Sequence, residues 1–129
     1  MGTANYQSCR IAVCDDRDDY RGLLYALIRR AGGLEIVGEA RNGAEAVSIA
    51  ETLQPDVMLL DLAMPVMDGM EALPKIVEVS PATRVIVLTG FSSQSMRIRA
   101  MEAGASGFIE KGERPAVLID TVRAACARD

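Results

Sequence analysis

Short apolar runs alternate along the chain with longer segments in which apolar residues recur at helical spacing. The short runs lie at residues 10–16, 34–40, 56–60, 84–90 and 107–112. Their length and the turn residues around them predict β-strands, and the alternating pattern of the second run places that strand near a sheet edge. The segments between them predict helices at residues 20–31, 42–54, 67–80, 93–104 and 114–127.

The first helical segment has a regular apolar stripe, which predicts a helix that faces the core. Its members recur at i, i+3, i+4, i+7, i+8 and i+11 and are Tyr20, Leu23, Leu24, Leu27, Ile28 and Ala31. Gly32 and Gly33 follow and predict the end of this helix. The third helical segment contains Pro74, so we expect that helix to be kinked or to begin late.

The fourth helical segment, residues 93–104, has only a weak apolar stripe. Met96, Ala100 and Met101 define its expected core face, and Ile98 falls off that face. We therefore expect Ile98 to be an exposed apolar group that a protein partner recognises.

Strict alternation of strands and helices predicts an α/β fold with a parallel sheet and helices on both faces. Crossovers between parallel strands are right-handed, so covering both faces requires the winding to reverse between the first and third strands. A pocket is expected at that reversal, beyond the carboxyl ends of the strands. No repeat or low-complexity linker interrupts the pattern, and 129 residues suit one compact domain.

The charge balance narrows the partners of this domain. The chain has 18 acidic and 14 basic residues and a net charge of -4, which argues against direct nucleic-acid binding. Its first residues lack the apolar region of a signal peptide, and no apolar stretch approaches the length of a membrane span. We therefore expect a soluble cytoplasmic protein with no membrane association, whose partners are proteins or small ions.

The three cysteines, Cys9, Cys14 and Cys126, match no metal-ligand spacing. Cys9 and Cys14 are five residues apart, so a strand directs them to opposite faces. We expect all three cysteines to be reduced, as in a cytoplasmic protein, and Cys14 to be buried.

Polar residues stand where four of the apolar runs end. Asp15 and Asp16 close the first run, Asp61 follows the third, Thr89 lies at the end of the fourth and Lys111 at the end of the fifth. The carboxyl ends of parallel strands meet at one edge of the sheet, so these side chains are expected to share the pocket.

Several carboxylates in one pocket repel each other, since two unit charges roughly 4 Å apart cost about 4 kcal/mol at an effective dielectric constant near 20. Hard oxygen ligands with few other donors favour Mg²⁺ as the cation that relieves this repulsion. Lys111 adds a fixed ammonium group and Thr89 a hydroxyl donor. A metal, an ammonium and a hydroxyl around a carboxylate are arranged to hold a phosphoryl group, which favours phosphoryl transfer.

These residues lie in the motifs "CDD", "DVMLLDLAMPVMDG", "VLTG" and "GFIEK". Together they resemble the receiver domain of bacterial two-component response regulators. The stretches "GEARNGAEAV" and "GFIEKG" resemble the NarL/FixJ/LuxR-type subgroup, whose receivers precede a helix-turn-helix output domain. The resemblance implies a flavodoxin-like, doubly wound five-stranded parallel sheet in the order 2-1-3-4-5, with five helices on both faces. Gly112 departs from the family, in which proline often follows the lysine, and Asp68-Gly69 is interpreted as a turn and helix start without a chemical role.

The resemblance implies a role for each residue at the strand ends. Asp61 matches the phosphoacceptor, which takes a phosphoryl group from a phosphohistidine. The Mg²⁺ ligands that it implies are the carboxylates of Asp15, Asp16 and Asp61 and the backbone carbonyl of Ala63. Lys111 matches the phosphate-binding lysine, which neutralises phosphoryl oxygens together with the metal.

Thr89 matches the switch hydroxyl of the family and Phe108 its aromatic switch position. We expect phosphorylation to draw Thr89 inward, so that Phe108 fills the vacated space and the surface of the fourth helix, fifth strand and fifth helix changes. Ala63 and Phe91 match the positions that border the path of an attacking water. Neither side chain can orient a water molecule, so we expect the domain to lose its phosphate slowly. We also expect the domain to catalyse its own phosphorylation.

Each role has a simpler structural alternative. Asp15 and Asp16 could begin a loop and cap the helix that follows. Thr89 could be an ordinary strand residue, Lys111 a solvated surface lysine and Phe108 a core side chain. Agreement among four strand ends favours the functional interpretation.

Two other classes of function compete with the switch. A phosphohydrolase with an aspartyl nucleophile needs a second acid two residues after Asp61, where this chain has Ala63. A receiver-like interaction module that is never phosphorylated generally lacks part of the site, whereas here each matching position is filled. The chain has no histidine, so a histidine kinase or a histidine phosphotransfer protein must be the phosphoryl donor.

The resemblance assigns residues 9–128 to the receiver domain, and we expect residues 1–8 to be a flexible leader. The chain ends at Asp129, at or just after the fifth helix. It is therefore expected to be either a stand-alone receiver or, as we prefer, a fragment cut before a transcriptional output domain. A homodimer that forms on phosphorylation is compatible with this interpretation.

Overall fold

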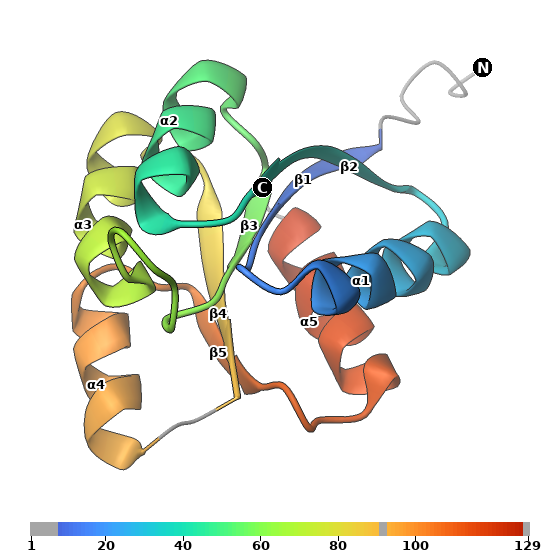
Figure 1. The fold of residues 1–129 in the computed structure, drawn as a ribbon. Helices are drawn as coiled ribbons and strands as arrows, with labels where there is room; N and C mark the ends of the chain where they lie inside the picture. The colour runs from blue at the N-terminus through green and yellow to red at the C-terminus, as the bar shows by residue number, and fades with distance from the viewer. Residues whose placement is uncertain (1–7, 91–92, 128–129) are drawn as a thin grey trace.

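The computed structural model describes residues 8–90 and 93–127, which form a five-stranded parallel sheet covered by helices on both faces (Figure 1). The strands are β1 (Cys9–Cys14), β2 (Leu34–Ala40), β3 (Val57–Leu60), β4 (Arg84–Thr89) and β5 (Gly107–Glu110). The helices are α1 (Asp18–Ala31), α2 (Gly43–Leu53), α3 (Gly69–Val79), α4 (Gln94–Glu102) and α5 (Pro115–Cys126).

The strand order β2-β1-β3-β4-β5 confirms the doubly wound, flavodoxin-like α/β fold. Helices α1 and α5 cover one face of the sheet, and α2, α3 and α4 cover the other (Figure 1). Strand side chains alternate between the two faces, so β1 sends Ile11 and Val13 to one core cluster and Ala12 and Cys14 to the other. The central strand β3 is buried along its whole length, as expected for a strand covered on both faces.

Helix α1 follows its predicted stripe with one exception. Leu24 and Ile28 are buried, and Tyr20 and Leu27 pack partly against the same core. Leu23, which the spacing placed on the core face, is instead 50% exposed, so that part of the prediction is wrong. Leu23 precedes the buried Leu24 by one position, which turns its side chain about 100° around the helix axis from that of Leu24. Gly32 ends the helix with a positive φ of 77°.

Helix α3 begins at Gly69 and runs through Pro74 as one element. Its start matches the predicted turn, because the side chain of Asp68 accepts a hydrogen bond of 2.8 Å from the backbone N–H of Glu71. A helix that begins only at Pro74 is therefore not what forms.

Helix α4 has a single buried residue in its range, Ala100, which confirms the weak stripe. Ile98 is 48% exposed, as predicted. Met96 packs against the core, but Met101 is 45% exposed, so its prediction as a core residue is wrong. The short helix lies on the sheet through Met96 and Ala100, which are four residues apart, and Met101 is turned about 100° from Ala100.

The cysteines depart from the sequence-based expectation. Cys9 and Cys126 form a disulfide with a Cα–Cα distance of 5.8 Å, so the prediction that both are reduced is wrong. The pairing arises because β1 begins and α5 ends at the same edge of the sheet, although the two residues are 117 positions apart. Cys9 and Cys126 therefore give no support to a cytoplasmic location. Cys14 is free and buried as predicted, and desolvation, followed by the charge of Asp15, raises the pKa of its thiol.

Candidate functional site

The polar strand-end residues lie directly on the ends of the strands that precede them. Asp15 follows β1, Asp61 follows β3, Thr89 is the last residue of β4 and Lys111 follows β5. Their backbones continue the sheet: Asp15 donates to the Ala40 carbonyl at 2.9 Å and Lys111 donates to the Thr89 carbonyl at 2.8 Å. The buried strands thus hold these side chains at one edge of the sheet, as the sequence predicted.

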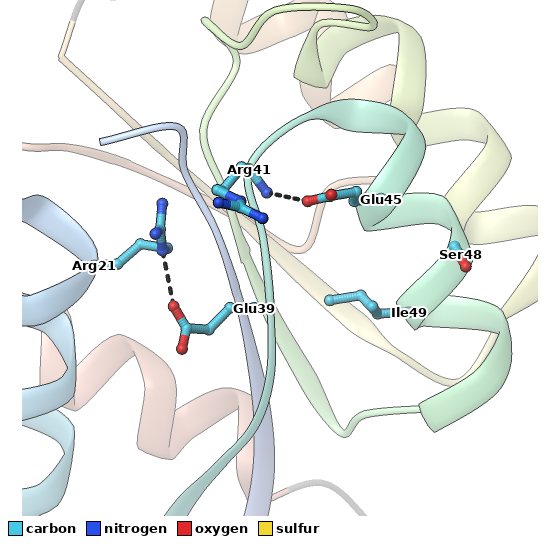
Figure 2. A pocket seen from close by; sticks show the side chains of 6 residues that line it. All are labelled: Arg21, Glu39, Arg41, Glu45, Ser48 and Ile49. Carbon is cyan, nitrogen blue, oxygen red and sulfur yellow. Dashed lines mark hydrogen bonds and ion pairs between the residues drawn. The ribbon is translucent and has the colours of Figure 1, made fainter. Parts of the chain in front are cut away.

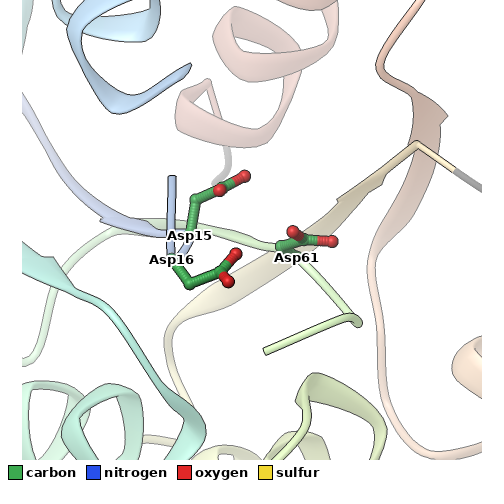
Figure 3. A group of neighbouring side chains, drawn as sticks. All are labelled: Asp15, Asp16 and Asp61. Atoms are coloured by element: carbon green, nitrogen blue, oxygen red, sulfur yellow. The ribbon is translucent and has the colours of Figure 1, made fainter. Parts of the chain in front are cut away.

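Three carboxylates meet at this edge. Asp15, Asp16 and Asp61 each offer an oxygen such that all three oxygens lie within 4.8 Å of one another (Figure 3). Asp15 and Asp61 are 2% and 4% exposed, whereas Asp16 is exposed to solvent. The cluster therefore has a buried floor and an open side.

The ammonium of Lys111 contacts the two buried acids. Its Nζ lies 2.6 Å from Oδ2 of Asp15 and 3.1 Å from Oδ2 of Asp61. Burial lowers the pKa of Lys111. The hydrogen bond to Asp15 and the charge of Asp61 raise that pKa by more, so its net shift is upward. Lys111 is thus a fixed cation inside the cluster rather than a solvated surface lysine.

Tyr20 is a site residue that the sequence reasoning missed. The Nζ of Lys111 lies 4.3 Å from the centroid of the Tyr20 ring, which is a cation–π contact. The apolar stripe places Tyr20 on the core face of α1, and its side chain does pack there in part. Its position in the first turn of α1, a few residues after Asp16, was the available signal.

Burial raises the pKa of Asp61, while the backbone N–H of Ala63 and the charge of Lys111 lower it and the charge of Asp15 raises it further. The Ala63 N–H donates to Oδ1 of Asp61 at 3.2 Å. Because the net shift is upward, the ionised Asp61 carboxylate is not fully stabilised by its neighbours. An additional cation at the cluster would stabilise it.

The donor set fits a magnesium ion in its chemistry. It consists of hard carboxylate oxygens that lie close together, with one acid open to solvent. Lys111 contacts only two of the three carboxylates, so a net negative charge remains on the cluster. The acidic cluster could therefore hold a divalent metal.

The helix-capping alternative for the acid pair is wrong. The N-cap residue of α1 is Arg17, and no side chain caps it. Asp15 instead accepts a hydrogen bond of 2.9 Å at Oδ1 from the backbone N–H of Arg17, which helps to hold its carboxylate towards Lys111.

The two predicted switch residues lie on neighbouring strands and on one face of the sheet. Phe108 is paired with Val87, and both belong to the core beneath α2, α3 and α4. Thr89 lies two residues after Val87, so its side chain points to that same face. Thr89 is 2% exposed and Phe108 8% exposed, and the guanidinium of Arg97 on α4 lies 4.8 Å from the Phe108 ring centroid.

Ala63 and Phe91 are the two residues expected to border the water path. Ala63 is exposed at the open side of the site, two residues after Asp61. Phe91 lies outside the described residues.

Gly69 is a second residue whose part in the site the sequence reasoning missed. The sequence predicts only a turn and helix start there. Its N–H donates to the Leu62 carbonyl at 2.9 Å, and a Cβ at this position would lie 2.2 Å from the carbonyl oxygen of Asp61. The start of α3 therefore rests on the backbone that carries Asp61. The "DG" after an apolar run was the signal in the sequence.

Comparison with known proteins shows the family of the chain. Residues 11–123 match the response regulator receiver domain. The chain is 36% identical over 113 residues to the chemotaxis protein CheY of Thermotoga maritima, covering 88% of this chain and 93% of that protein. It is 35% identical over 124 residues to the nitrate/nitrite response regulator protein NarL of Escherichia coli, covering 96% of this chain and 57% of that protein.

Among solved structures, a two-component response regulator of the LuxR family from Aurantimonas sp. SI85-9A1 matches with a TM-score of 0.89 and 32% identity, over 94% of this chain and 86% of that chain. The chain spans about half of the length of several curated relatives that it matches. Among the described residues, no helix has the length and apolar character needed to cross a membrane. On the profile match and these identities, the chain belongs to the response regulator receiver domain family, with NarL- and LuxR-type regulators among its homologues.

Proposed function

We propose that this domain is a phosphorylation-dependent signalling switch in which Asp61 accepts a phosphoryl group from a phosphohistidine. The observation that carries the proposal is the buried Asp61 carboxylate, which lies 3.1 Å from the Lys111 ammonium and within a cluster of three acids. The donor is a histidine kinase or a histidine phosphotransfer protein, because this chain has no histidine of its own.

In the transfer step, an oxygen of Asp61 forms a bond to phosphorus while the bond from phosphorus to the donor imidazole nitrogen breaks. The product is an acyl phosphate on Asp61, and the histidine is released without its phosphoryl group. Asp15, Asp16, Asp61 and the Ala63 carbonyl would hold Mg²⁺, and the bound ion would supply positive charge to the phosphoryl oxygens. Lys111 releases its contact with Asp61 and donates to another of those oxygens.

The burial of the site supports this mechanism. Asp15 and Asp61 are fixed by the strands that carry them, so little reorganisation is needed when the phosphoryl group arrives. Charge interactions are also stronger at this partly water-excluded edge than in bulk solvent. The domain itself therefore supplies most of the catalysis of its own phosphorylation.

The signal then passes from the site to the surface. The Thr89 hydroxyl moves towards the phosphoryl group, and Phe108, on the same face of the sheet, fills the space that Thr89 leaves. This movement changes the surface of α4, β5 and α5, where Ile98 is exposed. The output is transcription, by analogy with relatives such as the transcriptional regulatory proteins LnrK and LiaR of Bacillus subtilis. Phosphorylation favours a homodimer of the domain.

Resetting of the switch is slow. Ala63 has no carboxylate or amide that could orient a water molecule for attack on the acyl phosphate, and Phe91 has none either. Help of this kind typically contributes a rate factor of about 10²- to 10⁴-fold. A partner protein is therefore needed for rapid loss of the signal.

The experiment is incubation with a small acyl phosphate and Mg²⁺, followed by intact-mass measurement. One phosphoryl group should be added to the wild type and none to Asp61→Asn. Asp68→Asn is the matched control, because Asp68 is an exposed helix cap for which asparagine serves equally well. Labelling of Asp61→Asn would contradict the assignment, and an unlabelled wild type would favour an interaction module that is never phosphorylated.

A further inference from the structure

Arg21 is a largely buried arginine beside the acidic cluster, and its side chain is only 11% exposed. Its guanidinium contacts three segments of the chain: Nη1 donates to the Asp15 carbonyl oxygen at 2.7 Å, Nε donates to Oε1 of Glu39 at 2.8 Å, and Nη2 forms an ion pair with Asp18. Figure 2 shows the pair of Arg21 with Glu39, which bridges from α1 to β2. Arg21 thus joins the end of β1, the start of α1 and the edge strand.

Arg21 donates its hydrogen bond to a backbone carbonyl that lies between two of the acids in the cluster. The carbonyl oxygen of Asp15 belongs to the peptide that links Asp15 to Asp16, and these are two of the three acids in the cluster. On the other side of the same residue, the N–H of Asp15 donates to the Ala40 carbonyl at 2.9 Å. A planar peptide held in this way fixes the direction in which the chain leaves Asp15 and enters Asp16.

An ordered peptide matters for Asp16 because its side chain is exposed to solvent. Lys111 and the N–H of Arg17 hold the Asp15 carboxylate directly. Asp16 is exposed, so the peptide that precedes it is the nearest fixed point from which its carboxylate can be aimed into the cluster.

The charge of Arg21 and its hydrogen bond to Asp15 have opposite effects on a cation. A guanidinium near three acids weakens metal binding by repulsion, although Glu39 and Asp18 offset part of its charge. An ordered Asp15–Asp16 peptide strengthens metal binding, because it reduces the freedom that the ligands lose when they close on the ion. The two effects therefore predict opposite results when the side chain is changed.

We propose that Arg21 is a positioning residue for the metal site: its hydrogen bond to the Asp15 carbonyl orders the Asp15–Asp16 peptide and so raises the affinity for Mg²⁺. This inference rests on the proposed function, since it takes the acidic cluster to be the Mg²⁺ site. Residues that hold metal ligands in place are typically worth about 10- to 100-fold in affinity.

The test is calorimetric titration of the intact domain with Mg²⁺ alone, which needs neither a kinase nor phosphorylation. Arg21→Lys keeps the positive charge but cannot span three partners, and Arg21→Met removes the charge while keeping the aliphatic stem. Both variants should bind Mg²⁺ at least about fivefold more weakly than the wild type. Tighter binding by Arg21→Met, or unchanged binding by Arg21→Lys, would overturn the inference, because either result means that Arg21 acts only through its charge.

Three controls separate positioning from other effects. Ile28→Val loosens the core side of the same helix without touching the loop, so its Mg²⁺ affinity should equal that of the wild type. Glu39→Gln removes an ion-pair partner of Arg21 but leaves the Asp15 contact, and should change the affinity less than twofold. Weakened binding in Ile28→Val equal to that in Arg21→Lys would overturn the inference in favour of a general loss of helix stability.

The third control, Asp16→Asn, distinguishes this inference from the proposed function. If the wild type binds Mg²⁺ and Asp16→Asn binds it more weakly, the metal site is where the proposed function has it, and the Arg21 variants then test positioning alone. If Asp16→Asn binds as well as the wild type, the proposed metal site itself is wrong, and the inference falls with it.

Discussion

The α-carbon of Gly69 lies against the carbonyl oxygen of Asp61, so closely that a Cβ on Gly69 would sit 2.2 Å from that oxygen. The contact joins backbone to backbone, and no side-chain rotation can relieve it. The first turn of α3 is thereby seated on the end of β3, beside the carboxylate that we propose as the phosphoacceptor. A glycine that looks like a simple turn residue in the sequence therefore allows α3 to begin directly against the backbone of Asp61.

Gly69→Ala should therefore destabilise the domain, because either α3 or the end of β3 must shift to make room. We expect the free energy of unfolding in urea to fall by about 1–3 kcal/mol. Gly22→Ala is the matched control, since nothing lies within 4 Å of a Cβ there and the residue is inside α1. That control should gain roughly 0.5–1 kcal/mol from the higher helix propensity of alanine. Equal effects at the two positions would contradict the close contact.

Hydrophobic periodicity and strand-end position were sufficient to predict much of this molecule. Each strand and helix follows from a local run of apolar residues, and the parallel sheet with helices on both faces follows from their alternation. The strand order was implied by the resemblance to receiver domains. Asp15, Asp61 and Lys111 were brought together by one rule, that parallel strands end at one edge. These predictions succeeded because they depend on local patterns and on topology that leaves few alternatives.

The features that could not be predicted depend on contacts between distant elements. Cys9 and Cys126 meet only because a strand start and a helix end share an edge, which no local spacing records. Leu23 and Met101 are exposed because helices pack with narrower contact faces than their stripes suggest. Tyr20 reaches Lys111 through the angle at which α1 leaves β1, and sequence alone does not fix such an angle.

Asp61→Asn should stabilise the domain at neutral pH in the absence of metal. Burial raises the pKa of Asp61 in the folded state, so its contribution to stability is fully present below the ordinary aspartate pKa of about 3.9 and is lost as pH rises through the raised value. Asparagine cannot ionise and does not incur this loss. The melting temperature of Asp61→Asn should thus exceed that of the wild type at pH 7, and the difference should shrink as the pH falls towards 4.

Circular dichroism melts between pH 4 and 8 provide the measurement for this prediction, with Asp68→Asn as a control for replacing an exposed acid. Added Mg²⁺ should raise the melting temperature of the wild type more than that of Asp61→Asn. A wild type that is more stable than Asp61→Asn at pH 7 without metal would show that Lys111 stabilises the ionised carboxylate more than burial destabilises it.

Thr89→Ala should uncouple phosphorylation from the surface change without preventing phosphorylation. The variant keeps Asp61, Lys111 and the acid pair, so intact mass should still show the added phosphoryl group. Backbone amide shifts on phosphorylation should be smaller than in the wild type across residues 95–112, which include Arg97 above the Phe108 ring. Thr52→Ala is the control, because Thr52 is an exposed residue of α2 whose hydroxyl donates to the Ser48 carbonyl of its own helix. Wild-type shifts in Thr89→Ala would mean that the signal takes another route.

Reduction of the Cys9–Cys126 disulfide should destabilise the whole domain while leaving its site intact. The bridge joins residues 117 positions apart, so it restricts nearly the entire unfolded chain, and a loop of this size is worth about 3–5 kcal/mol in the chain-entropy description. Dithiothreitol, or the double variant Cys9→Ser with Cys126→Ser, should lower the midpoint of urea unfolding. Reductant should have no further effect on the double variant, because Cys14 is buried and its raised thiol pKa keeps it unreactive. Below the melting temperature, the Mg²⁺ affinity should not change, because the bridge lies at the edge where β1 begins and the acids lie where it ends. An unchanged midpoint on reduction would show that packing of α5 against the sheet holds these two ends together without the bond.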